Sequence, residues 1–138
     1  MSFETIVVGY DETPESQRAL EAAAELAERL SGRLVVTSVA SVMTGVARQG
    51  ATDPTDPPER HEEELTHARA YLAERKLDAD FVPAVGDPSD AIVALSRERS
   101  ADLIVVGPHH RSLLERLTGS SVSQSVAHHA PCSVLIVR

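Results

Sequence analysis

The chain has 138 residues, of which 42% are hydrophobic, 25% charged and 3% aromatic, a composition typical of one globular domain spanning residues 1–138. Thirteen basic and 21 acidic residues give a net charge of −8 with histidine neutral. We expect no nucleic-acid partner, because such proteins carry a basic face and often rows of stacking aromatics. No run of about 20 apolar residues is present, so we expect no membrane-spanning helix.

Cysteine usage and the first residues bear on the compartment. Cys132 is the only cysteine, so no disulfide forms within the chain, which fits a reducing environment. Residues 1–4 lack the basic region and apolar run that begin a signal peptide. We therefore expect a cytoplasmic protein.

The first half of the chain predicts a strand, a helix and a second strand. Residues 5–9 are a β-branched run, typical of a strand buried on both faces of a parallel sheet. Residues 13–30 predict a helix, because Thr13 suits the N-cap and apolar residues then recur every three or four positions. Gly32 is expected to end this helix in a left-handed conformation. Residues 34–39 predict the second strand.

The middle of the chain is less regular. Residues 40–58 contain two glycines and three prolines and predict a long mobile loop. Residues 59–77 predict a polar helix with one apolar side. Residues 81–85 predict a third strand, which Pro83 places at an edge of the sheet because proline cannot donate a ladder hydrogen bond.

The last part repeats this alternation. Asp87 suits the N-cap of a further helix, and residues 103–107 predict a fourth buried strand. A final helix is expected to begin at Ser120 or Ser121, and residues 133–137 predict the fifth strand.

Strands that alternate with helices predict an α/β, Rossmann-like fold: one five-stranded parallel sheet with helices on both faces. With the third strand at an edge and right-handed crossovers, the economical strand order is 3-2-1-4-5. The connections after strands 1 and 4 then leave on opposite faces, and α/β sheets bind ligands at such a switch point. We therefore expect a site beside Gly9, Tyr10, Asp11 and Gly107, where these two strands end.

The segment from Gly107 to Ser123 contains the residues best suited to bind an anion. Small residues allow the backbone to approach a ligand closely, and the free N–H groups of a helix starting at Ser120 or Ser121 favour a phosphate. Arg111 could pair with the same anion. The alternative interpretation is a tight turn and a helix cap without any ligand.

Four segments of the chain resemble the universal stress protein family, and together they cover nearly its whole length. They are residues 5–13, 86–88, 101–107 and 121–137. The resemblance implies an adenine nucleotide alpha-hydrolase-like fold, cytoplasmic dimers and a role in the stress response. Many members of the family bind ATP through a pattern of Gly, two residues, Gly, nine residues, then Gly and Ser or Thr.

The chain keeps this ATP pattern imperfectly. Gly107 matches its first glycine, His110 stands at the second, and Ser120–Ser121 replace the final pair. The resemblance implies that the phosphates lie near Gly107, that Tyr10 and Asp11 border the adenosine, and that Val39 touches the base. The residues assigned to the nucleotide are therefore Gly9, Tyr10, Asp11, Val39, Gly107, His110, Arg111, Ser120, Ser121 and Val122.

Several functions remain open at this point. The His110 side chain could crowd the phosphate path or contact a phosphate instead, and ATP, AMP and cyclic AMP are all candidate ligands. Asp11 could hold Mg²⁺ through water, or it could cap the turn before Thr13. The alternative to nucleotide binding is a protein that acts through protein–protein contacts. A hydrolase for a small anion ranks last because the sequence shows no nucleophile–base pair, and we expect any ATP hydrolysis to be weak.

Two histidine pairs, His109–His110 and His128–His129, raise the question of a metal. Neighbouring helical residues point about 100° apart, so one pair easily supplies only one ligand, and we predict no metal site. The second pair is expected on the surface at a helix C-terminus, where positive charge is favourable. Cys132 is expected to be a small buried residue.

The fifth strand predicts a partner. Its residues Val134, Leu135, Ile136 and Val137 include no charge and no proline, so an open edge here would be prone to aggregation. We expect the same strand of a second copy to cover it across a two-fold axis, giving a homodimer. The alternative is burial by a loop of the same chain.

Overall fold

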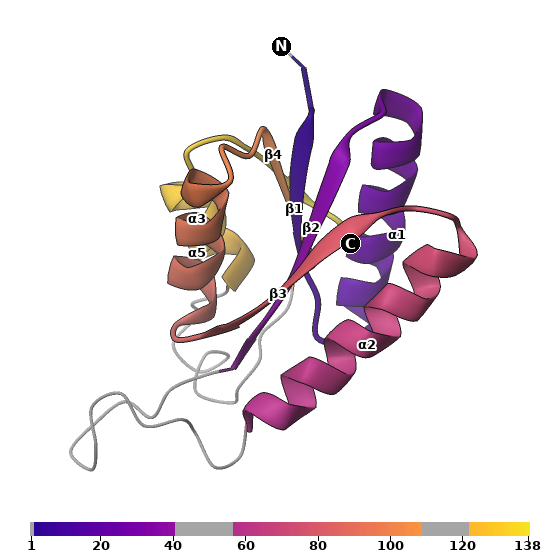
Figure 1. Cartoon of the computed structure of the whole chain (residues 1–138). Helices are drawn as coiled ribbons and strands as arrows, with labels where there is room; N and C mark the ends of the chain where they lie inside the picture. Colours follow the sequence, from indigo (N-terminus) through magenta and orange to yellow (C-terminus); the bar gives the residue numbers. More distant parts are fainter. Residues whose placement is uncertain (1, 41–56, 109–121) are drawn as a thin grey trace, which may run out of the picture.

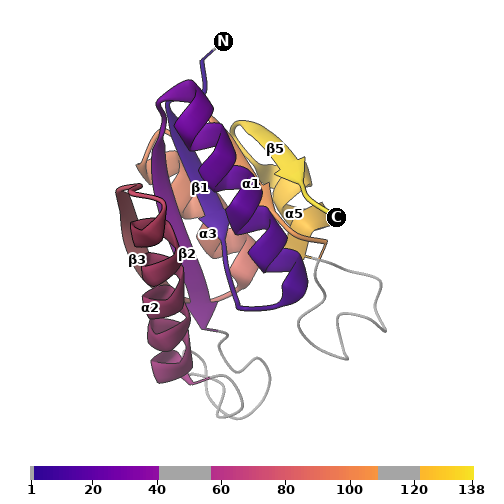
Figure 2. The same ribbon diagram turned by 90° about the vertical axis from the view of Figure 1, so that its right-hand side faces the viewer.

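The computed structural model describes residues 2–40, 57–108 and 122–138. Its strands and helices follow one another as β1 (Thr5–Gly9), α1 (Pro14–Leu30), β2 (Arg33–Ala40), α2 (Pro58–Glu74), β3 (Ala79–Val85), α3 (Pro88–Glu98), β4 (Leu103–Val106), α5 (Val122–His129) and β5 (Ser133–Ile136). The sheet is parallel with the order β3-β2-β1-β4-β5 (Figures 1 and 2). The predicted fold and strand order are confirmed.

Helices cover both faces of the sheet. Figures 1 and 2 show α1 and α2 on one face and α3 and α5 on the other. Strands β1 and β4 are neighbours, with Ile6 opposite Leu103 and Val8 opposite Val105. The helices that follow them, α1 and α5, lie on opposite faces, so the predicted switch point lies between these two strands.

The position of the central strands between two layers of helices explains why their sequences are apolar without alternation. Ile6 and Val8 belong to the core under α1 and α2, whereas Val7 belongs to the core under α3 and α5. All three side chains are fully buried, as are Ile104 and Val105 of β4. A strand between two helical layers buries both of its faces, which gives the continuous β-branched run.

Two helices begin as the sequence predicts. The Thr13 hydroxyl accepts a hydrogen bond from the backbone N–H of Ser16 at 3.2 Å, and the Asp87 carboxylate accepts one from the N–H of Asp90 at 3.0 Å. Each cap satisfies an N–H group that has no partner within its helix.

The predicted end of α1 is wrong in one detail. Ser31, with a φ of 54°, takes the left-handed conformation that we expected of Gly32. Gly32 is needed for packing instead, because a Cβ atom there would lie 2.9 Å from the carbonyl oxygen of Phe3.

The ends of the predicted loop belong to regular structure. Ala40 is the last residue of β2 and Pro58 the first of α2, while residues 41–56 lie outside the described part of the chain. Strand β3 is an edge strand, as Pro83 predicted. Ser120 and Ser121 also lie outside the described residues, and α5 is described from Val122.

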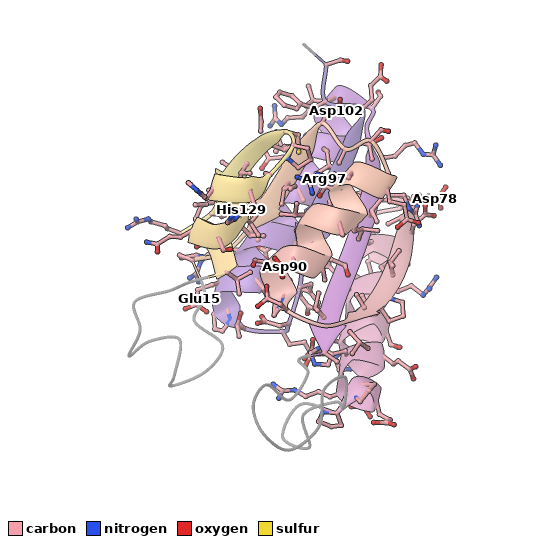
Figure 3. All side chains as sticks on the ribbon, turned by 90° about the vertical axis from the view of Figure 1, so that its left-hand side faces the viewer. Glu15, Asp78, Asp90, Arg97, Asp102 and His129 are labelled. Carbon is pink, nitrogen blue, oxygen red and sulfur yellow. The ribbon has the colours of Figure 1, made fainter. Side chains whose placement is uncertain are left out.

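Asp102 ties the starts of β1 and β4 together at the amino end of the sheet. Its carboxylate accepts hydrogen bonds from the N–H groups of Glu4 at 2.9 Å and Thr5 at 3.0 Å. Figure 3 shows Asp102 at one end of the molecule and Glu15, in the first turn of α1, toward the other. Within the three described ranges, no helix is both long enough and apolar enough to cross a bilayer.

Candidate functional site

A cleft opens at the carboxyl ends of β1 and β4, at the switch point. It contains about 420 Å³ of empty space, part of which is open solvent. Strands β1, β2 and β4 and helices α1, α3 and α5 all contribute to its walls. The lining residues are Gly9, Tyr10, Asp11, Ser16, Thr37, Val39, Pro88, Ile92, Val106, Gly107 and Val122.

The cleft brings together six of the residues predicted from the sequence. They are Gly9, Tyr10, Asp11, Val39, Gly107 and Val122. The other four predicted residues, His110, Arg111, Ser120 and Ser121, lie outside the described residues, so their part in a site stays a prediction.

Other cleft residues were missed by the sequence analysis. Thr37 could have been found, because it precedes Val39 by two positions and therefore faces the same side of β2. Ile92 of α3 was not singled out, because the sequence analysis assigned no apolar face to this helix. Ser16 could also have been found, because it lies in the first turn of the helix that follows β1.

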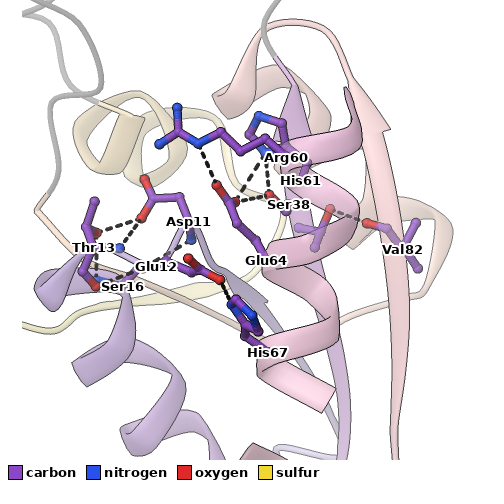
Figure 4. Close-up of polar contacts among 11 residues, drawn as sticks. Asp11, Glu12, Thr13, Ser16, Ser38, Arg60, His61, Glu64, His67 and Val82 are labelled. Atoms are coloured by element: carbon purple, nitrogen blue, oxygen red, sulfur yellow. Dashed lines mark hydrogen bonds and ion pairs between the residues drawn. The ribbon is translucent and has the colours of Figure 1, made fainter. Parts of the chain in front are cut away.

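A network of hydrogen bonds fixes the turn between β1 and α1 (Figure 4). Asp11 Oδ1 accepts hydrogen bonds from the Thr13 hydroxyl at 2.6 Å and from the Thr13 N–H at 3.2 Å. The N–H of Asp11 donates to Ser16 Oγ at 3.1 Å. Glu12 has a left-handed φ of 63°, which is uncommon for a residue other than glycine. Asp11 therefore caps this turn at the rim of the cleft.

Gly107 allows the end of β4 to contact the start of α1. A Cβ atom at this position would lie 2.9 Å from both the backbone carbon and the backbone oxygen of Glu15. We predicted that the small residue admits a ligand. The structure adds a packing reason, because the first turn of α1 occupies the space that a side chain would need.

Tyr10 is largely buried beside acidic residues. Burial, the largest cause, raises the pKa of Tyr10 to about 12, and the negative charges of Glu12, Glu64 and Asp11 add to this effect. Its hydroxyl donates a hydrogen bond to Gln17 Oε1 at 3.1 Å. The folded state therefore favours the neutral phenol.

We predict that Tyr10 contributes to alkaline unfolding. The pKa of Tyr10 in the folded protein lies above its ordinary value of about 10. The neutral phenol therefore stabilises the fold fully below about pH 10, and this stabilisation is lost as the pH rises from about 10 toward 12. The Tyr10→Phe variant should lose less stability than the wild type across this interval, as measured by urea unfolding. Equal losses in both proteins would contradict the prediction.

Of the residues considered for a metal, the second histidine pair and the cysteine lie in the described part of the chain. His128 and His129 are exposed at the C-terminal end of α5, and Figure 3 shows His129 on the outside of that helix. The described part of the chain contains no group of three metal-ligating side chains. Cys132 is only partly buried, which corrects the expectation of a buried residue. Burial, with the charge of Asp102, still raises the pKa of its thiol.

Comparisons with known proteins agree with this fold. The model of the universal stress protein family matches residues 2–138. The universal stress protein YxiE of Bacillus subtilis is 30% identical over 148 residues, covering 99% of each chain. The chain therefore belongs to the universal stress protein family.

Two solved structures of other universal stress proteins contain a nucleotide. A universal stress protein in complex with cAMP is 27% identical, with a TM-score of 0.74 over 100% of this chain and 99% of that one. The universal stress protein from Archaeoglobus fulgidus in complex with dAMP is 26% identical, with a TM-score of 0.74 and 100% of both chains covered.

Proposed function

We propose that the protein binds an adenine nucleotide in the cleft between β1 and β4 and serves as a dimeric stress-response or signalling module in the cytoplasm. The observation that carries the proposal is the cleft itself, which lies at the switch point and is lined by six of the ten predicted site residues. Two relatives of similar fold, in complex with cAMP and dAMP, support it.

The chemistry of the lining suits the two ends of a nucleotide. Val39, Ile92 and Val122 offer apolar contacts to a base, as ligand pockets generally do. Asp11 lies at the rim, where its carboxylate could accept hydrogen bonds from the adenosine. We place the phosphates near the backbone of Gly107, toward the predicted partners His110, Arg111, Ser120 and Ser121. With ATP, Asp11 could also hold Mg²⁺ through water.

A substitution that fills the cleft tests the position of the nucleotide. Val122 is partly exposed and lines the cleft, so Val122→Phe should weaken the binding of a fluorescent AMP analogue by at least about tenfold, the equivalent of about 1.4 kcal/mol. Leu30→Phe, at the C-terminal end of α1 and outside the cleft lining, at a residue that is 47% exposed, is the matched control and should bind normally. Normal binding by Val122→Phe would place the nucleotide elsewhere.

The proposed dimer forms through β5. This strand is the last in the sheet and pairs with β4, and Leu135 and Ile136 are each 37% exposed. Val134 and Val137 are partly buried against the chain's own two cores. Pairing with β5 of a second copy would cover the exposed apolar residues and the open backbone edge.

We expect Leu135→Lys to convert the dimer to a monomer, because two lysines would be buried near the two-fold axis. Light scattering coupled to gel filtration measures the mass directly. Val85→Lys, on the opposite edge of the sheet, should stay dimeric. A wild-type protein that is monomeric at tens of micromolar, or a Leu135→Lys variant that stays dimeric, would exclude this interface.

A further inference from the structure

A buried polar cluster joins β2 to α2 (Figure 4). Ser38 of β2 is fully buried, and His61 and Glu64 of α2 are each 2% exposed. Ser38 Oγ lies 2.6 Å from Glu64 Oε2 and 2.5 Å from His61 Nδ1, and that nitrogen lies 3.2 Å from the same Glu64 oxygen. The sequence analysis assigned His61 and Glu64 to a polar helix and did not find this cluster.

The distances determine which groups donate. The Ser38 hydroxyl has one proton and donates it to Glu64. Its contact with His61 is then a hydrogen bond only if the proton on Nδ1 points to Ser38 Oγ. Glu64 acts as the acceptor in these contacts, and Arg60 Nε lies 3.4 Å from its other oxygen.

The three residue types resemble a hydrolase triad, but their arrangement excludes that role. The histidine of a triad contacts the serine and the carboxylate through opposite ring nitrogens. Here the same Nδ1 of His61 lies near both Ser38 and Glu64. The Ser38 side chain also faces α2 and has no exposed surface, so a substrate cannot reach it. The cluster holds chain segments in place.

Ser38 stands between two residues of the cleft. Successive side chains of a strand point to opposite faces, so Ser38 faces α2 while Thr37 and Val39 line the cleft. The carbonyl oxygen of Thr37 also accepts a hydrogen bond from the N–H of Tyr10 at 3.0 Å. A shift of Ser38 would therefore move Thr37 and Val39 along the cleft wall.

The start of α2 needs this anchor. Its N-cap residue, Pro57, makes no side-chain capping hydrogen bond. Leu65, Ala68 and Leu72 supply the apolar contacts of α2 with the core. Burying ionisable groups is costly and adds little stability compared with apolar packing. A buried polar cluster at this end therefore contributes a defined position of the helix against β2.

We propose that Ser38, His61 and Glu64 are positioning residues for the cleft, because they lock β2 to α2 and so hold Thr37 and Val39 in the geometry that receives the ligand. This inference rests on the proposed nucleotide binding. It assigns control of affinity to residues that do not themselves touch the nucleotide.

The first test uses two variants that break the cluster in different ways. Ser38→Ala removes the shared hydroxyl. Glu64→Gln keeps the shape, but its NH₂ group must face either the Arg60 donor or the donors of Ser38 and His61. We expect each variant, folded by circular dichroism, to bind AMP about tenfold more weakly in calorimetry, within the usual range of coupling between sites.

Two controls separate positioning from general stability. Ser96→Ala removes another buried hydroxyl, which donates only to the Ile92 carbonyl within α3 at 2.8 Å. Leu72→Ala lowers stability at a fully buried position of α2 outside the cluster. Both should bind AMP with wild-type affinity at a temperature where they are folded. Weaker binding by Leu72→Ala, equal to that of Ser38→Ala, would overturn the positioning role.

A third pair of variants tests whether another hydrogen-bond donor at position 61 can replace the histidine. His61→Asn places an amide donor near the position of Nδ1, whereas His61→Leu removes the donor. We expect His61→Asn to retain most of the affinity and His61→Leu to lose it. If the wild type binds none of AMP, cyclic AMP and ATP, the proposed function is rejected; if it binds cyclic AMP or ATP but not AMP, the variants are compared with that nucleotide. If the wild type binds and Ser38→Ala and Glu64→Gln bind equally well, nucleotide binding stands and the positioning role is rejected.

Discussion

Gly107→Val is expected to lower the free energy of unfolding by about 2–3 kcal/mol, the upper part of the range found for overpacked sites. The first added carbon would lie 2.9 Å from two backbone atoms of Glu15. Backbone atoms in the first turn of a helix cannot turn aside as the tip of a flexible side chain can. Either α1 moves or β4 bends, and urea unfolding measures the cost.

Gly9→Ala is the matched control for this prediction. Its Cβ atom would lie 3.2 Å from Ile92 Cδ1, and the end of an isoleucine side chain can shift by a few tenths of an ångström. We expect a loss well below that of Gly107→Val. Unchanged stability in Gly107→Val would show that the contact with Glu15 does not require glycine.

The stability loss in Gly107→Val also determines how nucleotide binding by Gly107 variants is interpreted. A Gly107 variant displaces the turn that carries Ser16 and thereby disturbs the cap of Asp11. Weaker nucleotide binding in such a variant would not identify Gly107 as a ligand contact. Val122→Phe, which fills the cleft without entering the packing of α1 against β4, is the sharper probe.

Ile104→Ala should lower the free energy of unfolding by about 3–4 kcal/mol, as expected for a large-to-small change in a closed core. Ile104 is fully buried in β4, and it packs in the core beneath α3 and α5. The surrounding sheet is paired on both sides, so it cannot collapse to fill the cavity. Thermal and urea unfolding both report the change.

Leu30→Ala provides the comparison, because it removes the same number of carbon atoms from a residue that is 47% exposed. We expect a loss below about 1 kcal/mol there, consistent with the smaller area removed from contact. Similar losses in the two variants would mean that Ile104 does not lie in a closed, well-packed core.

Local signals in the sequence predicted the fold well. The β-branched run of β1, the Thr13 cap and Pro83 at the edge each depend on residue type and near neighbours, and each agrees with the structure. The left-handed residue at the end of α1 was assigned wrongly, because either Ser31 or Gly32 could end the helix. The glycine at position 32 is explained by its packing against Phe3, which is distant in sequence.

The position of the cleft follows from the predicted strand order. Gly9, Tyr10 and Gly107 follow from where β1 and β4 end. The cluster around Ser38 could not be predicted in this way, because His61 and Glu64 look like exposed helix residues until α2 is placed against β2. Polar residues that are buried in pairs leave no periodic signal in the sequence.

Calorimetry of the wild-type protein with AMP, cyclic AMP and ATP with magnesium tests the central claim most directly. The account predicts saturable binding of at least one of these nucleotides, with a stoichiometry of one per chain and competition among those that bind. Absence of heat up to millimolar concentrations of all three would contradict nucleotide binding in the cleft.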